Sequence, residues 1–224
     1  MFLGKIHTLT TDCGRCTLKK RGCFHRYRYG KRILDILFSF LLLCFLWLPM
    51  LAIAAAIRLT SHGGALFRQI RVGQGGIPFV CYKFRTMYED APRDCPTSAF
   101  TNAERFVTPI GRFLRRSSLD ELPQLFNVLR GEMSLVGPRP LIPCEAEVHA
   151  WRMRCGVYQL RPGITGLAQI CGRDRLPDAE KTRLDVRYVK RVSFWEDFRI
   201  VGKTLLRVCS GDGIAGIYRR IEKI

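Results

Sequence analysis

The stretch ILFSFLLLCFLWLPMLAIAAAI, residues 36–57, decides the fold class, because it is a continuous apolar run without one charged side chain. At 1.5 Å rise per residue, a helix of this length reaches roughly 33 Å, about the thickness of one hydrocarbon core. The alternative is a buried helix of a soluble protein, but such helices rarely continue this far without a polar stripe. The stretch therefore predicts a membrane helix.

Pro49 lies a little past the middle of this run and leaves two paths open. A proline removes one backbone donor and clashes with the carbonyl four residues earlier, so it can return the helix to its starting leaflet or form a tolerated kink in a spanning helix. Residues 1–32 are basic, with Asp12 as their only acid, and Arg58, Arg68 and Arg71 follow the run. Because positive charge is retained on the cytoplasmic side, basic flanks at both ends slightly favour the returning path.

The charge balance restricts the partners of the chain. Among 224 residues there are 37 Lys and Arg against 19 Asp and Glu, a formal net charge of +18. Such a surplus points to nucleic acid, an anionic membrane surface or phosphorylated substrates. A membrane-anchored nucleic-acid-binding or adaptor protein is the alternative to an enzyme, and it predicts basic and aromatic residues interleaved on one face. Here the arginines gather at glycine turns beside paired acids, so we expect no nucleic-acid partner.

The length allows one catalytic domain after the membrane segment. Its pattern predicts an α/β (α+β) fold, in which residues 65–73 and 77–87 form a β-hairpin across a glycine-rich turn. A loop follows, and helices are expected near residues 122–129, 144–155, 180–192 and 194–209. We divide the chain into a basic cysteine-containing extension (1–28), a membrane helix-break-helix (29–58) and a cytoplasmic catalytic domain (59–224).

The last of these helices carries an apolar face, which consists of Phe194, Phe198, Val201, Leu205 and Val208. Packing of this face on the domain core is the favoured interpretation. An amphipathic helix that lies in the membrane interface is the alternative.

Two adjacent carboxylates, Asp120 and Glu121, lie in RRSSLDELPQL at residues 115–125. Ser118 and Glu121 have the spacing of a capping box, in which both side chains satisfy donors at a helix start. Pro123 argues against that arrangement and fits better at or near the first helical position. The acids then precede the positive end of a helix, which keeps carboxylates ionised. Asp120 becomes a candidate nucleophile, and Glu121, together with Asp120, a candidate ligand for Mg²⁺.

Attack by a carboxylate on a diphosphate requires cations on the phosphate oxygens, because like charges repel. Arginine suits this task, since its guanidinium holds phosphate in a bidentate fork, and glycines nearby let the backbone approach. The candidate phosphate-binding cations lie at turns or along one strand: Lys83, Arg85, Arg115, Arg139, Arg161 and Arg173.

Four ordered motifs carry a family resemblance: YKFRTM (82–87), SLDELPQLFNVLRGEMSLVGPRPL (118–141), RPGITGLAQICGR (161–173) and LDVRYV (184–189). Over roughly residues 29–210 the chain resembles the bacterial sugar transferases, the monotopic phosphoglycosyl transferases that start glycan assembly on a polyprenol carrier. It resembles their minimal form. Leu167, Cys171 and Leu48 depart from the residues that the family often has, which leaves the sugar specificity and the bend of the helix open.

The resemblance implies transfer of a phosphosugar from a UDP-sugar to polyprenol (undecaprenyl) phosphate, with release of UMP, through a covalent intermediate and with Mg²⁺. It implies Asp120 as the nucleophile, Glu121 as the Mg²⁺ ligand, Asp185 near the site, and a helix that re-enters the cytoplasmic leaflet at Pro49. Expected partners are the UDP-sugar, polyprenol phosphate, the inner leaflet of the bacterial cytoplasmic membrane and downstream glycosyltransferases. The resemblance is also compatible with a homodimer.

The amino end is not covered by this resemblance. Cys13, Cys16, Cys23 and His25 provide enough ligands for a tetrahedral Zn²⁺, although the spacing of the second pair is unusual. The alternative is a basic tail of free thiols that binds anionic lipid by its charge.

Overall fold

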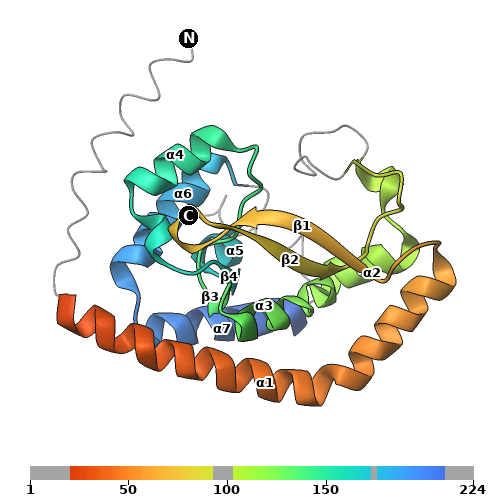
Figure 1. Cartoon of the computed structure of the whole chain (residues 1–224), viewed down its shortest axis with the longest axis horizontal. Helices are drawn as coiled ribbons and strands as arrows, with labels where there is room; N and C mark the ends of the chain where they lie inside the picture. The colour runs from red at the N-terminus through yellow and green to blue at the C-terminus, as the bar shows by residue number, and fades with distance from the viewer. Residues whose placement is uncertain (1–20, 93–102, 173–175, 210–224) are drawn as a thin grey trace, which may run out of the picture.

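The structure, a computed structural model, describes residues 21–92, 103–172 and 176–209, and it combines helices with two small sheets beside one long amino-terminal helix (Figure 1). The mixed α and β fold is therefore confirmed. In chain order the main elements are α1 (Arg21–Thr60), β1 (Leu66–Val72), β2 (Pro78–Phe84), α2 (Pro109–Ser117), η6 (Leu119–Glu121), α3 (Gln124–Arg130), β3 (Ser134–Val136), α4 (Ala146–Arg154), β4 (Gly163–Thr165), α5 (Leu167–Cys171), α6 (Asp178–Arg191) and α7 (Phe194–Cys209). Shorter 3-10 turns span Gln74–Gly76, Ala103–Phe106 and Val157–Gln159.

The predicted hairpin is confirmed as the antiparallel pair of β1 and β2. Lys83 lies opposite Phe67, and Arg71 lies opposite Phe79. Because residues at every second position share a face of the sheet, Lys83, Cys81 and Arg71 are on one side. Cys81 is buried against Val128 and Met133, so this side of the hairpin is turned toward α3.

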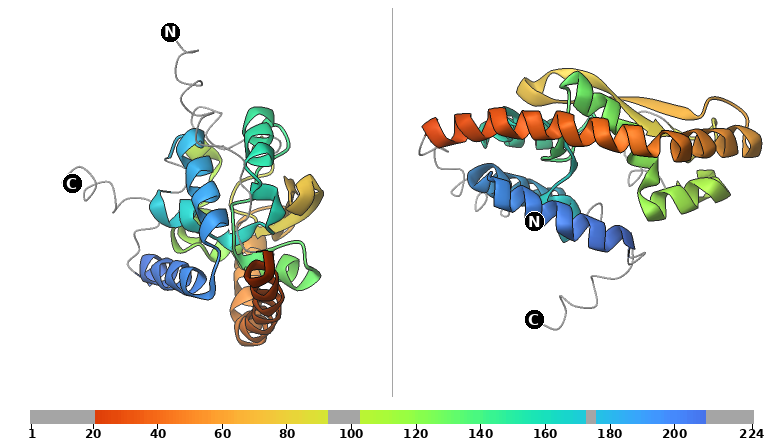
Figure 2. Two further views of the ribbon diagram at one scale, coloured as in Figure 1. Left: turned by 90° about the vertical axis from the view of Figure 1, so that its left-hand side faces the viewer. Right: turned by 90° about the horizontal axis from the view of Figure 1, so that it is seen from below.

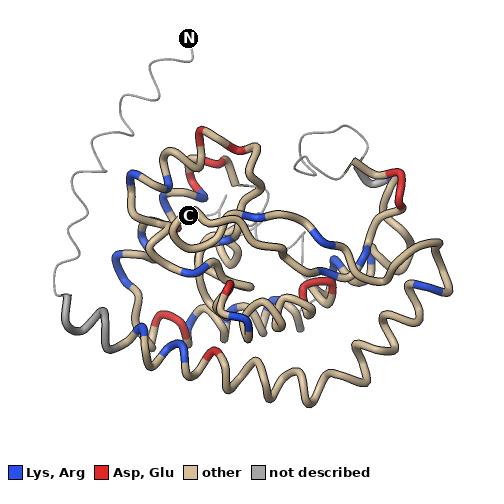
Figure 3. The backbone as a smooth tube through the Cα atoms, viewed as in Figure 1, with Lys and Arg blue, Asp and Glu red and all other residues tan. Residues whose placement is uncertain are grey.

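Helix α1 is longer than the apolar run that predicted it, and it contains Pro49 in its interior. It bends part-way along, and its second part rises toward β1 (Figure 1). Residues Tyr27–Thr60 are long and apolar enough to cross a membrane, and no Lys, Arg, Asp or Glu interrupts the middle of the helix (Figure 3). Much of its surface is apolar and exposed, including Phe38, Phe40, Phe45, Trp47 and Leu51.

Both parts of α1 contact the rest of the chain. In the first part, Asp35 accepts hydrogen bonds from Ser134 Oγ at 2.8 Å and from the Leu135 amide at 3.1 Å. In the second part, Ile57 is fully buried and packs with Phe84 and Leu114. The exposed apolar middle therefore lies between two anchored ends.

Most of the apolar face that the sequence predicted for α7 does not pack on the core. Of its predicted core face, Phe198 is 65% exposed and Leu205 is 60% exposed, while Ile200 is fully buried. Asp197 is also buried and accepts a hydrogen bond from Tyr188 Oη at 2.6 Å. The helix packs on the core through these residues and through Val201, which was part of the predicted face. The rest of that face, Phe194, Phe198, Leu205 and Val208, is an exposed apolar stripe. Figure 2 shows α7 beside α1 on the lower face of the molecule, where Tyr27 and Lys31 of α1 bond to Asp197.

Helix α2 was not predicted, although the sequence carries its start signal. Thr108 is the N-cap, and its hydroxyl accepts a hydrogen bond from the Gly111 amide at 2.9 Å. Pro109 follows at the first helical position, where a proline loses no helical hydrogen bond. A Thr-Pro pair before an amphipathic stretch would have been enough to place this helix.

Candidate active site

The acid pair lies in η6, the 3-10 turn between α2 and α3. Ser118 joins α2 to this turn at φ 58°, in the left-handed region, and is the only non-glycine residue with positive φ among the described ones. Its side chain makes no N-cap hydrogen bond to the turn, so the capping-box alternative is wrong. Pro123 immediately precedes α3, close to the predicted position. The two acids therefore precede a helix, as the proline indicated.

Glu121 is the centre of the polar contacts in this site. Its carboxylate is buried, and Oε1 accepts hydrogen bonds from Lys83 Nζ at 2.9 Å and from Arg139 Nη1 at 3.2 Å. Lys83 comes from β2, and Arg139 comes from the segment after β3. Two cations that lie far apart in the sequence thus meet on one carboxylate, which compensates the cost of burying its charge.

Asp120 lies beside this ionic cluster and is partly buried. Burial raises the pKa of its carboxyl, and the neighbouring charge of Glu121 raises it further. Lys83, Arg115 and Arg139 act in the opposite direction and lower the pKa. The ionisation of Asp120 therefore depends on the surrounding cations, as is typical of groups at functional sites.

Arg115 reaches the site because α2 packs closely on the segment after β2. Its Nε donates to Thr86 Oγ1 at 2.9 Å. The close approach requires Gly111, since a Cβ there would lie 2.1 Å from the Thr86 carbonyl oxygen. The structure thus brings together three of the predicted phosphate-binding cations, Lys83, Arg115 and Arg139, around the acid pair.

Arg85 does not join this cluster. Its guanidinium donates to the carbonyl oxygens of Ser61, at 2.9 Å, and His62, immediately after α1. The side chain therefore binds backbone carbonyls at the carboxy-terminal end of α1. The sequence placed Arg85 on the same strand face as Lys83, two residues earlier. β2 ends at Phe84, so this alternation does not apply to the Arg85 side chain.

Arg161 is also placed away from the acid pair. Its Nε donates to the Gly131 carbonyl at 2.8 Å, beyond the carboxy end of α3. Arg32 binds the same helix end, where it donates to the Val128 carbonyl at 2.6 Å. The acid pair lies at the opposite end of α3. Arg173 lies outside the described residues.

Asp185 is connected to the segment of Arg139 through another residue, Arg152. It is buried in α6 and forms an ion pair with Arg152 of α4. Arg152 Nη1 donates in turn to the Arg139 carbonyl at 2.7 Å. Sequence reasoning missed Arg152, since no turn or motif singles it out, and it missed Arg71, which shares a hairpin face with Lys83. That shared face follows from the two-residue period of β2 together with the hairpin register, in which Arg71 lies opposite Phe79.

The two predicted metal sites, for Zn²⁺ near the amino end and for Mg²⁺ at the acid pair, differ in how much of each the structure describes. Cys13 and Cys16 lie outside the described residues, and the side chains of Cys23 and His25 are not described either, so the zinc hypothesis stays a prediction. The described part of the chain contains no group of three or more His, Cys, Asp or Glu placed to hold a metal. Asp120 and Glu121 are two adjacent carboxylates, and such a pair would suit Mg²⁺ bound jointly with substrate phosphates better than a metal held by protein alone.

Comparison with known proteins decides the family. The sequence model of the bacterial sugar transferases matches residues 26–211. The chain belongs to the bacterial sugar transferase family. This sugar transferase is 41% identical over 226 residues to the UDP-glucose:undecaprenyl-phosphate glucose-1-phosphate transferase of Caulobacter vibrioides, which covers 94% of this chain and 83% of that protein.

Two further relatives of this sugar transferase are of similar length. The uncharacterized sugar transferase EpsL of Bacillus subtilis is 41% identical over 188 residues, covering 82% of this chain and 89% of EpsL. The exopolysaccharide production protein ExoY of Rhizobium meliloti is 37% identical over 200 residues, covering 82% of this chain and 87% of ExoY. The range matched by the family model, residues 26–211, spans the acid pair and the cations around it.

Proposed function

We propose that this chain is a phosphoglycosyl transferase that moves a phosphosugar from a UDP-sugar to polyprenol (undecaprenyl) phosphate and releases UMP. The observation that carries the proposal is the acid pair at the start of α3, with Lys83 and Arg139 on Glu121 and with Asp120 beside them. Relatives named for UDP-glucose and undecaprenyl phosphate support this substrate class. The product would be the lipid-linked sugar that begins an exopolysaccharide, capsule, O-antigen or glycoprotein glycan.

The proposed reaction has two steps at one carboxylate. A carboxylate oxygen of Asp120 attacks the phosphorus that bears the sugar, the bond to the UMP oxygen breaks, and UMP leaves with that electron pair. An oxygen of polyprenol phosphate then attacks the same phosphorus, and the bond to Asp120 breaks, which restores the carboxylate. Lys83, Arg115 and Arg139 surround Asp120 and would stabilise charge on the phosphate oxygens.

The acid pair also suits Mg²⁺. Asp120 and Glu121 would hold the ion, which would neutralise diphosphate charge when bound. Glu121 is already oriented by Lys83 and Arg139. These cations fix the carboxylate before a substrate arrives.

The position of α1 supports a site at the membrane surface. Its two anchored ends contact the same catalytic domain, through Asp35 at one end and Ile57 at the other. We infer that α1 is broken at Pro49 and re-enters the cytoplasmic leaflet there, and that the domain lies on the cytoplasmic face of the bacterial inner membrane. The exposed stripe of α7 would then lie in the interface of the same leaflet.

The test is UMP release by the purified full chain with Mg²⁺, polyprenol phosphate and a panel of UDP-sugars, UDP-glucose first. Labelled UDP-sugar without acceptor should leave label on the protein, and Asp120→Asn should abolish both this label and turnover. Failure of every donor to give UMP would contradict the proposed function. Wild-type turnover by Asp120→Asn would contradict only the assignment of the nucleophile.

A further inference from the structure

The segment that carries Arg139 is held at three consecutive carbonyl oxygens. The Arg139 carbonyl accepts from Arg152 Nη1 at 2.7 Å, and the Pro140 carbonyl accepts from Arg71 Nη1 at 3.1 Å. The Leu141 carbonyl accepts from the Val72 amide at 2.9 Å. The donors come from α4 and β1, so the segment is fixed from two sides.

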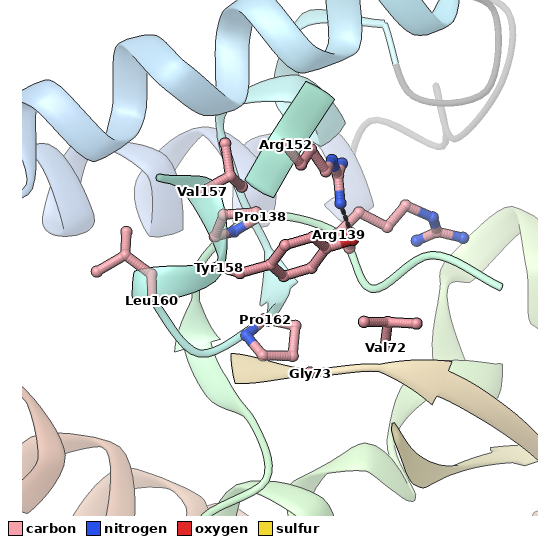
Figure 4. A pocket seen from close by; sticks show the side chains of 9 residues that line it. All are labelled: Val72, Gly73, Pro138, Arg139, Arg152, Val157, Tyr158, Leu160 and Pro162. Atoms are coloured by element: carbon pink, nitrogen blue, oxygen red, sulfur yellow. Dashed lines mark hydrogen bonds between the residues drawn. The ribbon is translucent and has the colours of Figure 1, made fainter. Parts of the chain in front are cut away.

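Arg152 is itself immobilised. Its side chain is 2% exposed, and its ion-pair partner Asp185 is 1% exposed. One guanidinium therefore joins Asp185 of α6 to the backbone at Arg139. The planar fork of arginine can make both contacts at once, and the point charge of lysine does not reproduce this. Figure 4 shows Arg152 reaching the Arg139 carbonyl while the Arg139 guanidinium extends away from it.

Arg152 and Arg139 differ in exposure, and therefore in whether they can reach a substrate. Arg152 is too deeply buried to touch a phosphate of the substrate. The Arg139 side chain is 28% exposed and reaches Glu121 Oε1 at 3.2 Å. Fixing the Arg139 backbone restricts where its guanidinium can lie, and a displacement of about 1 Å in such a group can cost on the order of 10²-fold in rate.

We propose that Arg152, oriented by Asp185, is a positioning residue that acts on the reaction through Arg139. The proposal rests on the proposed function, and it goes beyond it by assigning a role to a buried ion pair that lies behind the site. Arg71 provides the second hold on the same segment. Neither residue was singled out by the motifs, and each donates a hydrogen bond to a backbone oxygen of this segment.

The first test compares turnover of Arg152→Met and Arg152→Lys with that of the wild-type full chain. We expect kcat to fall about 10²-fold in Arg152→Met, with a smaller change in KM and only partial rescue by lysine. Arg154→Met is the matched control, because Arg154 is exposed on the same helix, and it should keep wild-type kcat.

Loss of Arg152 alone leaves Asp185 buried without its partner, which can unfold the chain. The variant Arg152→Met/Asp185→Leu removes both charges, and such apolar replacements are often neutral or stabilising. It should show a wild-type-like thermal transition together with the same loss of kcat. Recovery of wild-type kcat in this folded double variant would overturn the proposal.

A double-mutant cycle with Arg139→Ala decides whether Arg152 acts through Arg139. We expect Arg152→Met/Asp185→Leu to lower kcat little further once the Arg139 side chain is absent. Effects that multiply would indicate a general structural role and would overturn the inference. The proposed function fails separately, if the wild-type chain releases no UMP from any donor.

Hydrogen exchange gives a readout that does not depend on turnover. The Val72 amide bonds to Leu141, so loosening the segment should speed exchange in the peptide that contains Val72. We expect faster exchange there in Arg152→Met/Asp185→Leu than in Arg154→Met. Equal exchange in the two variants would overturn the proposal, whatever the reaction proves to be.

Discussion

Asn127 offers the sharpest test of how the fold builds the site, because its side chain joins α3 to β2. It is fully buried. Its Oδ1 accepts from the Tyr82 amide at 3.1 Å, and its Nδ2 donates to the Val80 carbonyl at 2.7 Å and to Glu132 Oε2 at 2.6 Å. α3 follows the acid pair and β2 carries Lys83, so this amide sets the relation between the two halves of the ionic cluster.

The Asn127→Ala variant removes three hydrogen bonds and leaves two backbone groups of β2 without a partner. At about 1–3 kcal/mol for each of the two buried backbone groups left unpaired, the expected loss in the free energy of unfolding is about 2–6 kcal/mol. At roughly 2–4 °C per kcal/mol for a chain of this size, Tm should fall by roughly 4–24 °C. UMP release should fall as well, since Lys83 and Glu121 lose their fixed separation.

The measurement is thermal unfolding of the purified full chain in the same detergent or nanodisc for all variants. Asn127→Asp should lose at least as much stability as Asn127→Ala, because an acceptor then faces the Val80 carbonyl and Glu132. Glu132→Gln keeps an acceptor for Nδ2 and is the control, with a change of about 1 kcal/mol or less. A Tm of Asn127→Ala within about 2 °C of wild type would refute the role given to this amide.

Three further predictions concern Asp185, Gly111 and the path of α1. Burial raises the pKa of Asp185 from 3.8 to about 6, against the opposing charge of Arg152. Between these pH values the folded chain holds a proton that the unfolded chain lacks, so this group makes the free energy of unfolding rise as pH falls. Asp185→Asn should remove this pH dependence, measured as the free energy of unfolding at several pH values. An unchanged pH dependence in the variant would contradict the prediction. Gly111→Ala should destabilise the chain by about 1–3 kcal/mol, because the new Cβ meets the Thr86 carbonyl. The control Gly202→Ala has open space around the new Cβ and should stabilise the chain slightly. Equal Tm values for the two variants would exclude this close packing of α2. Cysteines introduced on either side of Pro49 should react only from the cytoplasmic side, and periplasmic labelling of one end would exclude the re-entrant helix.

Local patterns predicted those parts of the fold that local patterns determine. The hairpin, α4, α6 and α7 follow from periods of two and 3.6 residues, and Pro123 located the start of α3. The outward-facing stripe of α7 could not be predicted, because its hydrophobic pattern does not distinguish protein core from lipid. The core contact is made by Ile200, by Val201 and by Asp197, which is buried because three side chains donate to it: Tyr27, Lys31 and Tyr188.

The arginines show most clearly where sequence reasoning reaches its limit. All of them carry the same charge, and a glycine turn beside one suits phosphate binding as well as it suits a bond to backbone oxygen. In the structure Arg85 and Arg161 bind carbonyls near helix ends, where unpaired carbonyl groups and the negative end of the helix dipole attract cations. Only Arg115 and Arg139, with Lys83, surround the acid pair among the predicted cations that the structure describes. Whether an arginine binds a helix end or the acid pair is set by where each helix ends in space. Buried residues such as Arg152 then restrict the positions of the cations that remain at the acid pair.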